Sequence, residues 1–587
     1  MNETRDVVVV GAGPVGLMLA CELRLAGVDV LVVERLSEPD MTVKAGAINA
    51  PTAQAMDRRG MLPQLIEAQR AVLAHFGGRG GAGSNGRPPV FGHFAGIMVD
   101  PGLIDLEDAA FAGVGPAGQA TLVAQQAIES ILAQRAAELG VVVRRGVEVG
   151  EFTDDGVGVT VACGDRVVRT AWLVGCDGGR STVRKRAGFE FPGLDPEITG
   201  RQALVRMTGT EGLQPGWNTT PTGIYVHGPM PGRLLTVEVD GPPADRDAPV
   251  SAEELRDSLY RVSGVRVRID AVQSATRFTD NTRQVPEYRK GRVLLAGDAA
   301  HVHSPFGGQG LNLGMGDAVN LGWKLAAVIR GRASEDLLDT YTGERHPIGA
   351  WVLEWTRAQV ALMRTDPRSR AMRALTTELL ASTPAATTVF KKIAGVLHRY
   401  DLGSDHPLVG AAPPDLPLSD GTRLAEHFAT GTGILLDLTD SPTLAATAAR
   451  HPDHIRLVTA KPAQPTGFSA LLIRPDGIVA WAADTSATEG LEQALTRWFG
   501  TPRLIRTRAV PIAARPTRLI GVTPMLAPDS GGLVPASRDE PFEGNAATRG
   551  IGSTIAEVFA RDSATVVVSD YPSDGDTRWG GSRLSSR

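Results

Sequence analysis

A short apolar run followed by three spaced glycines restricts the fold of this chain more than any other feature. Residues 7–10 are four consecutive valines, and a β-branched run bounded by glycine predicts a buried parallel strand. Gly11 then permits a tight turn, Gly13 lets the backbone approach a pyrophosphate, and Gly16 lets the following helix pack on the strand. The pattern therefore predicts a strand, a turn and a helix that together bind a dinucleotide.

The residues after the glycines strengthen this prediction. Residues 15–26 have the apolar spacing of a helix, and residues 28–33 predict a second strand. That strand ends in Glu34, where an acidic side chain would accept hydrogen bonds from ribose hydroxyls. Pyrophosphate would bind at the helix N-terminus. A tight turn without a ligand would not require the helix, the second strand or the terminal acid. These features together do not distinguish FAD from NAD.

Composition excludes several classes of partner and site. A net charge of -5 over 587 residues gives no reason to expect nucleic acid or an anionic membrane as a partner. The three cysteines are not spaced as CxxC, so neither a redox dithiol nor a metal site is predicted. No apolar run reaches the ~18–20 residues of a membrane helix, and the first strand leaves no room for a signal peptide. We expect a soluble, cytoplasmic protein of several domains.

A second motif begins at Asp177. Residues 172–176 predict a strand, Asp177 stands at its end, and Ser181 or Thr182 could cap the helix that follows. An Asp-Gly-Gly sequence also favours a plain strand-to-helix turn without any ligand. By itself this motif therefore does not predict a ligand site, and its interpretation depends on the other motifs of the chain.

A third motif surrounds Asp298. Residues 293–296 predict another short buried strand, and Asp298 would accept hydrogen bonds from polyol hydroxyls. A glycine-rich loop over 301–310, stiffened by Pro305, leads into a predicted helix over 311–330. The N-terminal amides of that helix would stabilise negative charge on a reduced flavin by ~1–2 kcal/mol. Together with the first motif, this loop predicts FAD as the bound cofactor.

The three motifs, in this order and spacing, resemble the class A flavoprotein monooxygenases, the aromatic hydroxylases of para-hydroxybenzoate hydroxylase type. The sequence is most similar to the subgroup that acts on aromatic polyketides with angucycline, anthracycline and tetracycline skeletons. The resemblance covers residues 5–500 and includes Gly-Asp-Ala-Ala-His at 297–301, Gly-Gly-Gln-Gly-Leu-Asn-Leu-Gly at 307–314, the segment 317–324 and Arg-Pro-Asp-Gly at 474–477.

The resemblance implies a set of cofactor-binding residues. Glu34 and Arg35, with the three glycines, would hold the ADP half of FAD, and Asp177 would serve both FAD and NADPH. Gln125 would contact the ribityl region, although the family usually has Val-Pro-Gln where this chain has Val-Ala-Gln. Asp298 would bind the ribityl or pyrophosphate end. The isoalloxazine ring would lie beside Pro305, with its N1 and O2 near the backbone of Gly310, Leu311 and Asn312.

The resemblance also implies a reaction. NADPH or NADH reduces the flavin, O2 adds to form a C4a-hydroperoxyflavin, and an electron-rich phenol takes the distal oxygen. We therefore expect a monooxygenase of antibiotic biosynthesis that hydroxylates a polycyclic aromatic polyketide. No catalytic side chain is nominated, because the flavin carries the chemistry. His301 is expected to be structural, and His93 to line the pocket or the surface.

Other functions stay open at this point. The same skeleton could undergo Baeyer–Villiger oxygenation or an oxygenase-linked dehydration. A NAD-dependent dehydrogenase that works through the C-terminal tail would need a Tyr-xxx-Lys pair, which the tail does not contain. A non-catalytic flavin-binding protein would hold a flavin that NADPH cannot reduce.

The expected fold class is α/β. A Rossmann-like FAD-binding domain comprises residues 1–72, 100–187 and 281–345, and an inserted β-sheet substrate domain comprises 73–99 and 188–280. Residues 346–418 form a helical linker and connector. Residues 419–500 form a thioredoxin-like domain without CxxC, for which we expect a structural role. This domain could provide a contact between subunits, and we expect a homodimer as one assembly.

The tail, residues 501–587, is similar to the opening of a short-chain dehydrogenase at 548–559 and 564–570. Ala546 replaces the first glycine of that fingerprint, and no apolar strand precedes it. We therefore expect a truncated, inactive and poorly ordered fusion.

Overall fold

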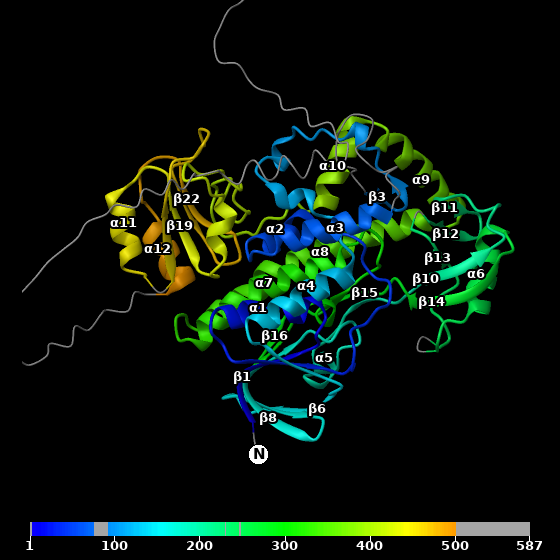
Figure 1. Ribbon diagram of the computed structural model, residues 1–587, viewed down its shortest axis with the longest axis horizontal. Helices are drawn as coiled ribbons and strands as arrows, with labels where there is room; N and C mark the ends of the chain where they lie inside the picture. The colour runs from blue at the N-terminus through cyan, green and yellow to red at the C-terminus, as the bar shows by residue number, and fades with distance from the viewer. Residues whose placement is uncertain (1–2, 76–91, 229, 246–247, 453, 501–587) are drawn as a thin grey trace, which may run out of the picture. The chain divides into compact units, whose positions relative to one another are not determined.

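The computed structural model describes residues 3–75, 92–228, 230–245, 248–452 and 454–500. All of them belong to one compact unit, Met1–Ile505 (Figure 1). Residues 76–91, which belong to the expected substrate domain, and the tail with its dehydrogenase-like segment lie outside the described residues.

A mainly parallel sheet forms the centre of the first domain. Its strand order is β16-β17-β8-β1-β2-β5, with the antiparallel hairpin β6–β7 attached to β8. All pairs from β17 to β5 are parallel. The strands are β1 Glu3–Val10, β2 Val30–Glu34, β5 Val142–Arg145, β6 Val149–Asp154, β7 Val159–Cys163, β8 Arg166–Gly175, β16 Arg289–Lys290 and β17 Val293–Leu295. This sheet confirms the predicted Rossmann-like α/β fold.

Helices α1 (Pro14–Leu25), α4 (Gln125–Glu138) and α7 (Gly310–Ile329) pack side by side over this sheet (Figure 1). The valines of β1 are buried because β1 is a central strand, its side chains alternate between the two faces of the sheet, and both faces are covered. Gly13 is the N-cap of α1, and Pro14 fits the first turn because its missing N–H would have no partner there. The first apolar run thus forms the floor of the site.

A second sheet forms the predicted substrate domain. It is antiparallel, in the order β11-β12-β13-β10-β14, and α6 (Ala252–Ser263) packs on one of its faces. Its strands are β10 Thr199–Thr208, β11 Gly216–Thr220, β12 Gly223–His227, β13 Arg233–Glu238 and β14 Arg268–Phe278. Because side chains alternate along a strand, Leu234 faces α6 while Leu235 and Val237 face Phe306 of the third motif.

The C-terminal domain has a four-stranded sheet in the order β20-β19-β21-β22. Strands β19 and β20 are parallel, and the other two pairs are antiparallel. Its elements are β19 Gly433–Asp437, α11 Pro442–Ala449, β20 Ile455–Thr459, β21 Ala470–Ile473, β22 Val479–Ala483 and α12 Leu491–Phe499. This order of strands and helices agrees with the predicted thioredoxin-like domain.

The remaining elements connect these layers. Helix α8 is 28 residues long and contains Pro347 in its interior. The elements are α2 Ala50–Asp57, α3 Leu62–His75, β3 His93–Phe94, β4 Ile97–Met98, α5 Thr182–Arg186, β9 Gly193–Leu194, β15 Thr282–Gln284, β18 His301–Val302, α8 Asp336–Met363, α9 Pro367–Leu380 and α10 Thr383–Ala394.

Buried charges join the C-terminal domain to the first domain. Arg474, in the turn after β21, donates two hydrogen bonds of 2.8 Å to Glu344 of α8. Lys324 of α7 lies 3.0 Å from the same carboxylate. Removing one member of such a buried set would leave an uncompensated charge, so the pairing holds the two domains in register.

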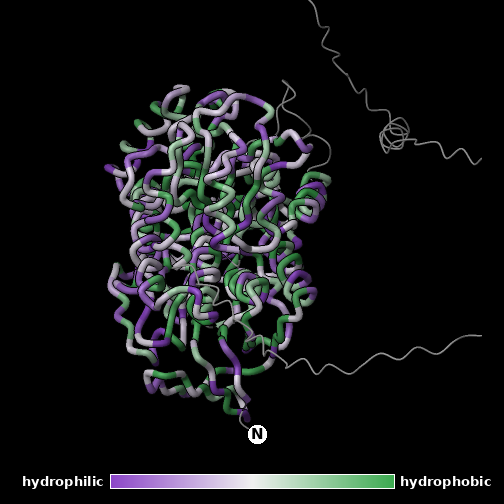
Figure 2. The backbone as a smooth tube through the Cα atoms, turned by 90° about the vertical axis from the view of Figure 1, so that its left-hand side faces the viewer, coloured by the Kyte–Doolittle hydropathy of each residue, from purple (hydrophilic) through white to green (hydrophobic). Residues whose placement is uncertain are grey.

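Among the described residues, no helix is long and apolar enough to cross a membrane. Figure 2 shows hydrophilic residues interrupting the hydrophobic ones along the backbone.

Candidate flavin and substrate sites

The glycine-rich turn between β1 and α1 is closed on one side and open on the other. A Cβ at Gly11, whose φ is 108°, would lie 2.4 Å from the carbonyl oxygen of Cys176. A Cβ at Gly16 would lie 2.0 Å from the carbonyl oxygen of Gly11, whereas one at Gly13 would meet nothing within 4 Å. The fold itself therefore requires Gly11 and Gly16, and the open space at Gly13 suits the approach of a pyrophosphate.

The three sequence motifs meet at the carboxyl edge of the parallel sheet. The first motif touches the second because Gly11 packs against Cys176, next to Asp177. It touches the third because a Cβ at Gly297 would lie 3.1 Å from Val15 of α1. Segments almost 300 residues apart thus form one surface, at the edge where ligands bind in open α/β sheets.

Glu34 ends β2 beside the glycine-rich turn. Its Oε2 accepts a hydrogen bond of 2.8 Å from the N–H of Ala12, and its Oε1 accepts one of 2.9 Å from the N–H of Leu36. These bonds fix the carboxylate, and each oxygen keeps a lone pair for a ribose hydroxyl. Arg35 is exposed.

Asp177 is occupied by its own helix. It accepts hydrogen bonds from the hydroxyl of Ser181 at 2.5 Å, from the N–H of Thr182 at 2.6 Å and from the N–H of Val183 at 3.1 Å. Ser181 is the N-cap of α5, and its hydroxyl accepts from the N–H of Arg184. In this structure Asp177 stabilises the strand-to-helix turn, and a contact with FAD or NADPH stays a prediction.

Asp298 and the start of α7 come together in the third motif. The side chain of Asp298 is exposed, and its Oδ1 lies 3.8 Å from the position of a Cβ at Gly310. The N-cap of α7, Gln309, makes no side-chain capping bond, so the first-turn amides keep their capacity to bind a negative group. Pro305 is also exposed, and Leu311 is partly buried.

Asn312 and Gln125 use their side chains within the protein. Asn312 accepts from the N–H of Asn49 at 2.8 Å and donates to the carbonyl of Gly308 at 2.9 Å. Gln125 donates from its side chain to Glu129 at 2.9 Å, and α4 begins at Gln125 without a side-chain cap. The backbone N–H of Gln125 also donates to the carbonyl of Ala45 at 2.9 Å, and a contact of either residue with the cofactor stays a prediction.

Asp317, which sequence reasoning did not single out as a site residue, anchors the third motif from below. Its fully buried carboxylate accepts from the N–H of Gly297 at 3.0 Å, contacts His301 Nε2 at 2.7 Å and accepts from Arg345 Nε at 2.7 Å. Burial alone would raise the pKa of Asp317, but Arg345 and His301 hold it below its usual value. The sequence signals for Asp317 were an acid inside an apolar helix and its place at the start of the segment 317–324, which resembles the family. His301 is thus engaged in holding the loop.

These residues fit FAD. The open position at Gly13, the fixed carboxylate of Glu34, the exposed Asp298 and the uncapped start of α7 lie along one connected surface. They would meet the pyrophosphate, ribose, ribityl chain and flavin ring in turn. Among the described residues, no group of three or more His, Cys, Asp or Glu could hold a metal ion.

An apolar, aromatic surface faces the loop of Pro305. Phe306 packs against Trp217 of β11, with ring centroids 6.2 Å apart, and against Phe278 of β14, at 5.9 Å. Ile224, Val226, Leu235 and Val237 complete this surface of the five-stranded sheet, which we call the Phe306-facing surface. These side chains are buried against Phe306, and a flat aromatic ligand beside them would have apolar and aromatic neighbours.

The sequence matches two family descriptions that together span almost all of residues 4–502. One is the FAD binding domain, over 4–356, and the other is the aromatic-ring hydroxylase C-terminal domain, over 406–502. The chain belongs to the FAD-dependent aromatic-ring hydroxylases. In this hydroxylase the first match ends within α8, and the second begins shortly before the thioredoxin-like sheet.

Individual relatives agree with this family. The chain is 43% identical over 527 residues to a 12-dehydrotetracycline 5-monooxygenase/anhydrotetracycline 6-monooxygenase of Streptomyces rimosus subsp. rimosus, covering 85% of this hydroxylase and 99% of the relative. The solved structure of OxyS anhydrotetracycline hydroxylase from Streptomyces rimosus is 40% identical, with a TM-score of 0.75 over 85% of this chain and 100% of that one. A dialkyldecalin synthase of Streptomyces rugosporus is 39% identical, over 85% of this chain and 99% of that protein.

Proposed function

We propose that this hydroxylase inserts one oxygen atom of O2 into a polycyclic aromatic polyketide during antibiotic biosynthesis, with FAD as cofactor and NADPH or NADH as reductant. The observation that carries the proposal is the meeting of the three motifs beside the Phe306-facing surface. The relatives that act on tetracycline skeletons support the substrate class.

The balanced reaction takes an aromatic C–H, O2, NAD(P)H and a proton to an aromatic C–OH, water and NAD(P)+. Bound FAD supplies the two-electron reduction and the oxygen activation. The chain's own groups bind and orient. Glu34 and the turn around Gly13 hold the dinucleotide, and the amides at the start of α7 stabilise negative charge on the ring. The Phe306-facing surface orients the substrate and excludes water.

Neither histidine of the third motif is well suited to act as a base in the chemical step. His301 is buried and bound to Asp317, and burial lowers the pKa of His303. We infer that an electron-rich ring reacts without an enzymatic nucleophile, so specificity depends on how the substrate lies on the Phe306-facing surface.

The purified protein tests this proposal directly. Bound oxidised flavin should give absorption bands near ~370 and ~450 nm, and NADPH should be consumed faster when a tetracyclic or angucyclic phenol is added. A colourless protein that FAD cannot reconstitute would contradict the proposal. Product analysis separates hydroxylation from the alternatives, since Baeyer–Villiger oxygenation inserts the atom into a ring and dehydration adds none.

A second candidate is catalysis without net oxidation on the same scaffold. The 39% identity to a dialkyldecalin synthase supports this second candidate. In that case product would form with FAD but without NADPH or O2. Turnover in the absence of NADPH, with a product of unchanged mass, would establish this alternative.

We further propose a cytoplasmic location and a homodimer. The cytoplasm supplies NADPH, and the three cysteines are all free, as is usual in a reducing compartment. Light scattering coupled to gel filtration tests the homodimer by measuring the mass of the particle in solution.

A further inference from the structure

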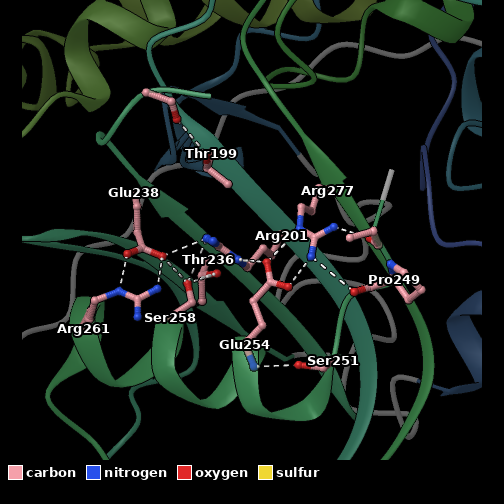
Figure 3. Close-up of polar contacts among 12 residues, drawn as sticks. Thr199, Arg201, Thr236, Glu238, Pro249, Ser251, Glu254, Ser258, Arg261 and Arg277 are labelled. Carbon is pink, nitrogen blue, oxygen red and sulfur yellow. Dashed lines mark hydrogen bonds and ion pairs between the residues drawn. The ribbon is translucent and has the colours of Figure 1, made fainter. Parts of the chain in front are cut away.

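The arginines on one face of the five-stranded sheet are all paired. On the face covered by α6, Arg201 donates at 2.8 Å to both Glu238 and Glu254 (Figure 3). Arg277 donates to Glu254 at 2.7 Å, and Arg261 donates to Glu238 at 2.6 Å. Each guanidinium on this face therefore has a carboxylate partner, as buried charges require.

Arg233 lies on the opposite face and has no such partner. It precedes Leu235 and Val237 by two and four positions on β13, and so points to the Phe306-facing surface. Its Nε is buried without a hydrogen-bond partner, and Arg233 forms no ion pair among the described residues. Burial lowers the pKa of Arg233. An unpaired guanidinium at an aromatic surface is costly unless a ligand compensates it.

His93 contributes a second donor near Arg233. Its Nδ1 accepts from the N–H of Gly96 at 3.1 Å, so in the neutral ring the proton is on Nε2. Burial lowers the pKa of His93 to about 4, with further contributions from the charges of Arg233 and Arg373. The ring also packs on Trp217, with centroids 4.5 Å apart. At neutral pH His93 is therefore an uncharged N–H donor.

We propose that Arg233 and His93 form a subsite for an ionised oxygen, a phenolate or enolate, of the polycyclic aromatic substrate. This inference rests on the proposed function and names the group by which that substrate is recognised. Two donors without an acceptor select an oxygen that carries lone pairs and negative charge. The neighbouring Trp217, Leu235 and Val237 favour an oxygen attached to a flat ring over a phosphate, which would lose its water without a matching partner.

Binding in this subsite sets the protonation state of the substrate. The phenol O–H bond breaks, the proton passes to solvent, and the oxyanion pairs with the guanidinium. An opposite charge at contact distance lowers the pKa of an acid by ~1–3 units. The bound ring is therefore more electron-rich than the free phenol at the same pH, and its orientation on the sheet is fixed at one end.

A dihydroxyanthraquinone tests the subsite without turnover, because its absorption moves to longer wavelength on ionisation. The dye is titrated from about pH 6 to about pH 9, free and bound to the FAD-loaded protein. We expect its pKa to fall by about one unit or more on binding to the wild type. Arg233→Met should abolish the fall, and Arg233→Lys should retain part of it.

Arg206→Met is the matched control, because Arg206 is an exposed arginine of the same sheet. Its substitution changes the net charge by the same amount as Arg233→Met. It should leave the pKa of the bound dye as in the wild type. An equal fall in wild type and Arg233→Met would overturn the subsite while leaving the proposed function intact. A wild-type protein that shows no saturable binding of the dye would overturn both. The FAD content of each variant verifies that it has folded.

Discussion

At the scale of single residues, the carboxylate of Glu34 illustrates how the fold prepares a site. Two backbone N–H groups fix its orientation before any ligand arrives. This residue could be predicted from the sequence because it ends a strand at a set distance from the glycines. Asp317 and Arg345 could not be assigned in the same way, because their roles depend on a contact between α7 and α8 that joins two residues 28 positions apart.

Glu34→Gln should weaken FAD binding. Hydrogen bonds to a charged group contribute about 1.5–3 kcal/mol, so we expect the dissociation constant to rise roughly ten- to hundredfold. Fluorescence titration of the apoprotein with FAD measures it. Glu38→Gln changes an exposed carboxylate four positions away and is the control. Equal FAD affinity in both variants would show that Glu34 does not contact the cofactor.

The buried carboxylates should make the free energy of unfolding depend on pH in the acidic range. Burial would raise the pKa of Glu344, but Arg474 and Lys324 hold it well below its usual value, and the pKa of Asp317 is also lowered. Such groups stabilise the fold above the unfolded-state pKa of about 4. As pH falls below that value the unfolded chain binds protons that the folded chain does not, so the stabilisation is lost.

Urea unfolding at a series of pH values measures this dependence. The midpoint should be constant above about pH 5 and should fall steadily below about pH 4. Glu254 also has a lowered pKa, chiefly through its hydrogen bond from Arg277. Glu254→Gln should make the fall less steep. A midpoint that does not change between these pH values would contradict the ion-pairing described above.

At the scale of elements, the turn between β1 and α1 separates what the fold needs from what the ligand needs. Gly16→Ala places a methyl group 2.0 Å from a carbonyl oxygen, whereas Gly13→Ala meets nothing within 4 Å. The first variant should lower the melting temperature of the apoprotein by several degrees or prevent folding. The second should keep the wild-type melting temperature and lose FAD affinity.

Differential scanning fluorimetry without FAD, followed by FAD titration, distinguishes the two variants. If Gly13→Ala binds FAD as tightly as the wild type, the pyrophosphate does not approach the backbone there. If Gly16→Ala has the same melting temperature as the wild type, the close packing described for β1, α1 and the turn between them is contradicted.

The secondary-structure elements differ in how well they could be predicted from the sequence. The valine runs predicted the parallel strands because both faces of those strands are buried, and the glycines marked the turns. The face of each antiparallel strand was harder to predict. Arg201, Arg233 and Arg277 look alike in the sequence, and only the register of β10, β13 and β14 shows which one shares the face of the residues that pack on Phe306.

At the scale of the whole molecule, the three motifs act together only because the sheet brings them to one edge. The order of the motifs predicted that they serve one FAD, and the structure adds that the strands before them, β1, β8 and β17, are parallel neighbours. The attachment of the C-terminal domain could not be predicted. It depends on Arg474 reaching Glu344, a pair separated by 130 positions.

Removal of residues 501–587 should leave turnover unchanged. The aromatic-ring hydroxylase match ends at residue 502, and 85% of this chain already covers 99% of the tetracycline-oxidising relative. Truncated and full-length proteins should have the same FAD content and the same kcat for substrate-dependent NADPH oxidation. A truncated protein that binds FAD but has lost turnover would show that the tail takes part in the reaction.

The most direct test of the central claim is oxygen labelling. The FAD-loaded protein is incubated with NADPH, a polycyclic aromatic polyketide phenol and 18O2, and the product is analysed by mass spectrometry and NMR. We predict one 18O atom in a new aromatic hydroxyl group, with none acquired from labelled water. A product that forms without 18O, or with its label derived from water, would contradict the assignment as a monooxygenase.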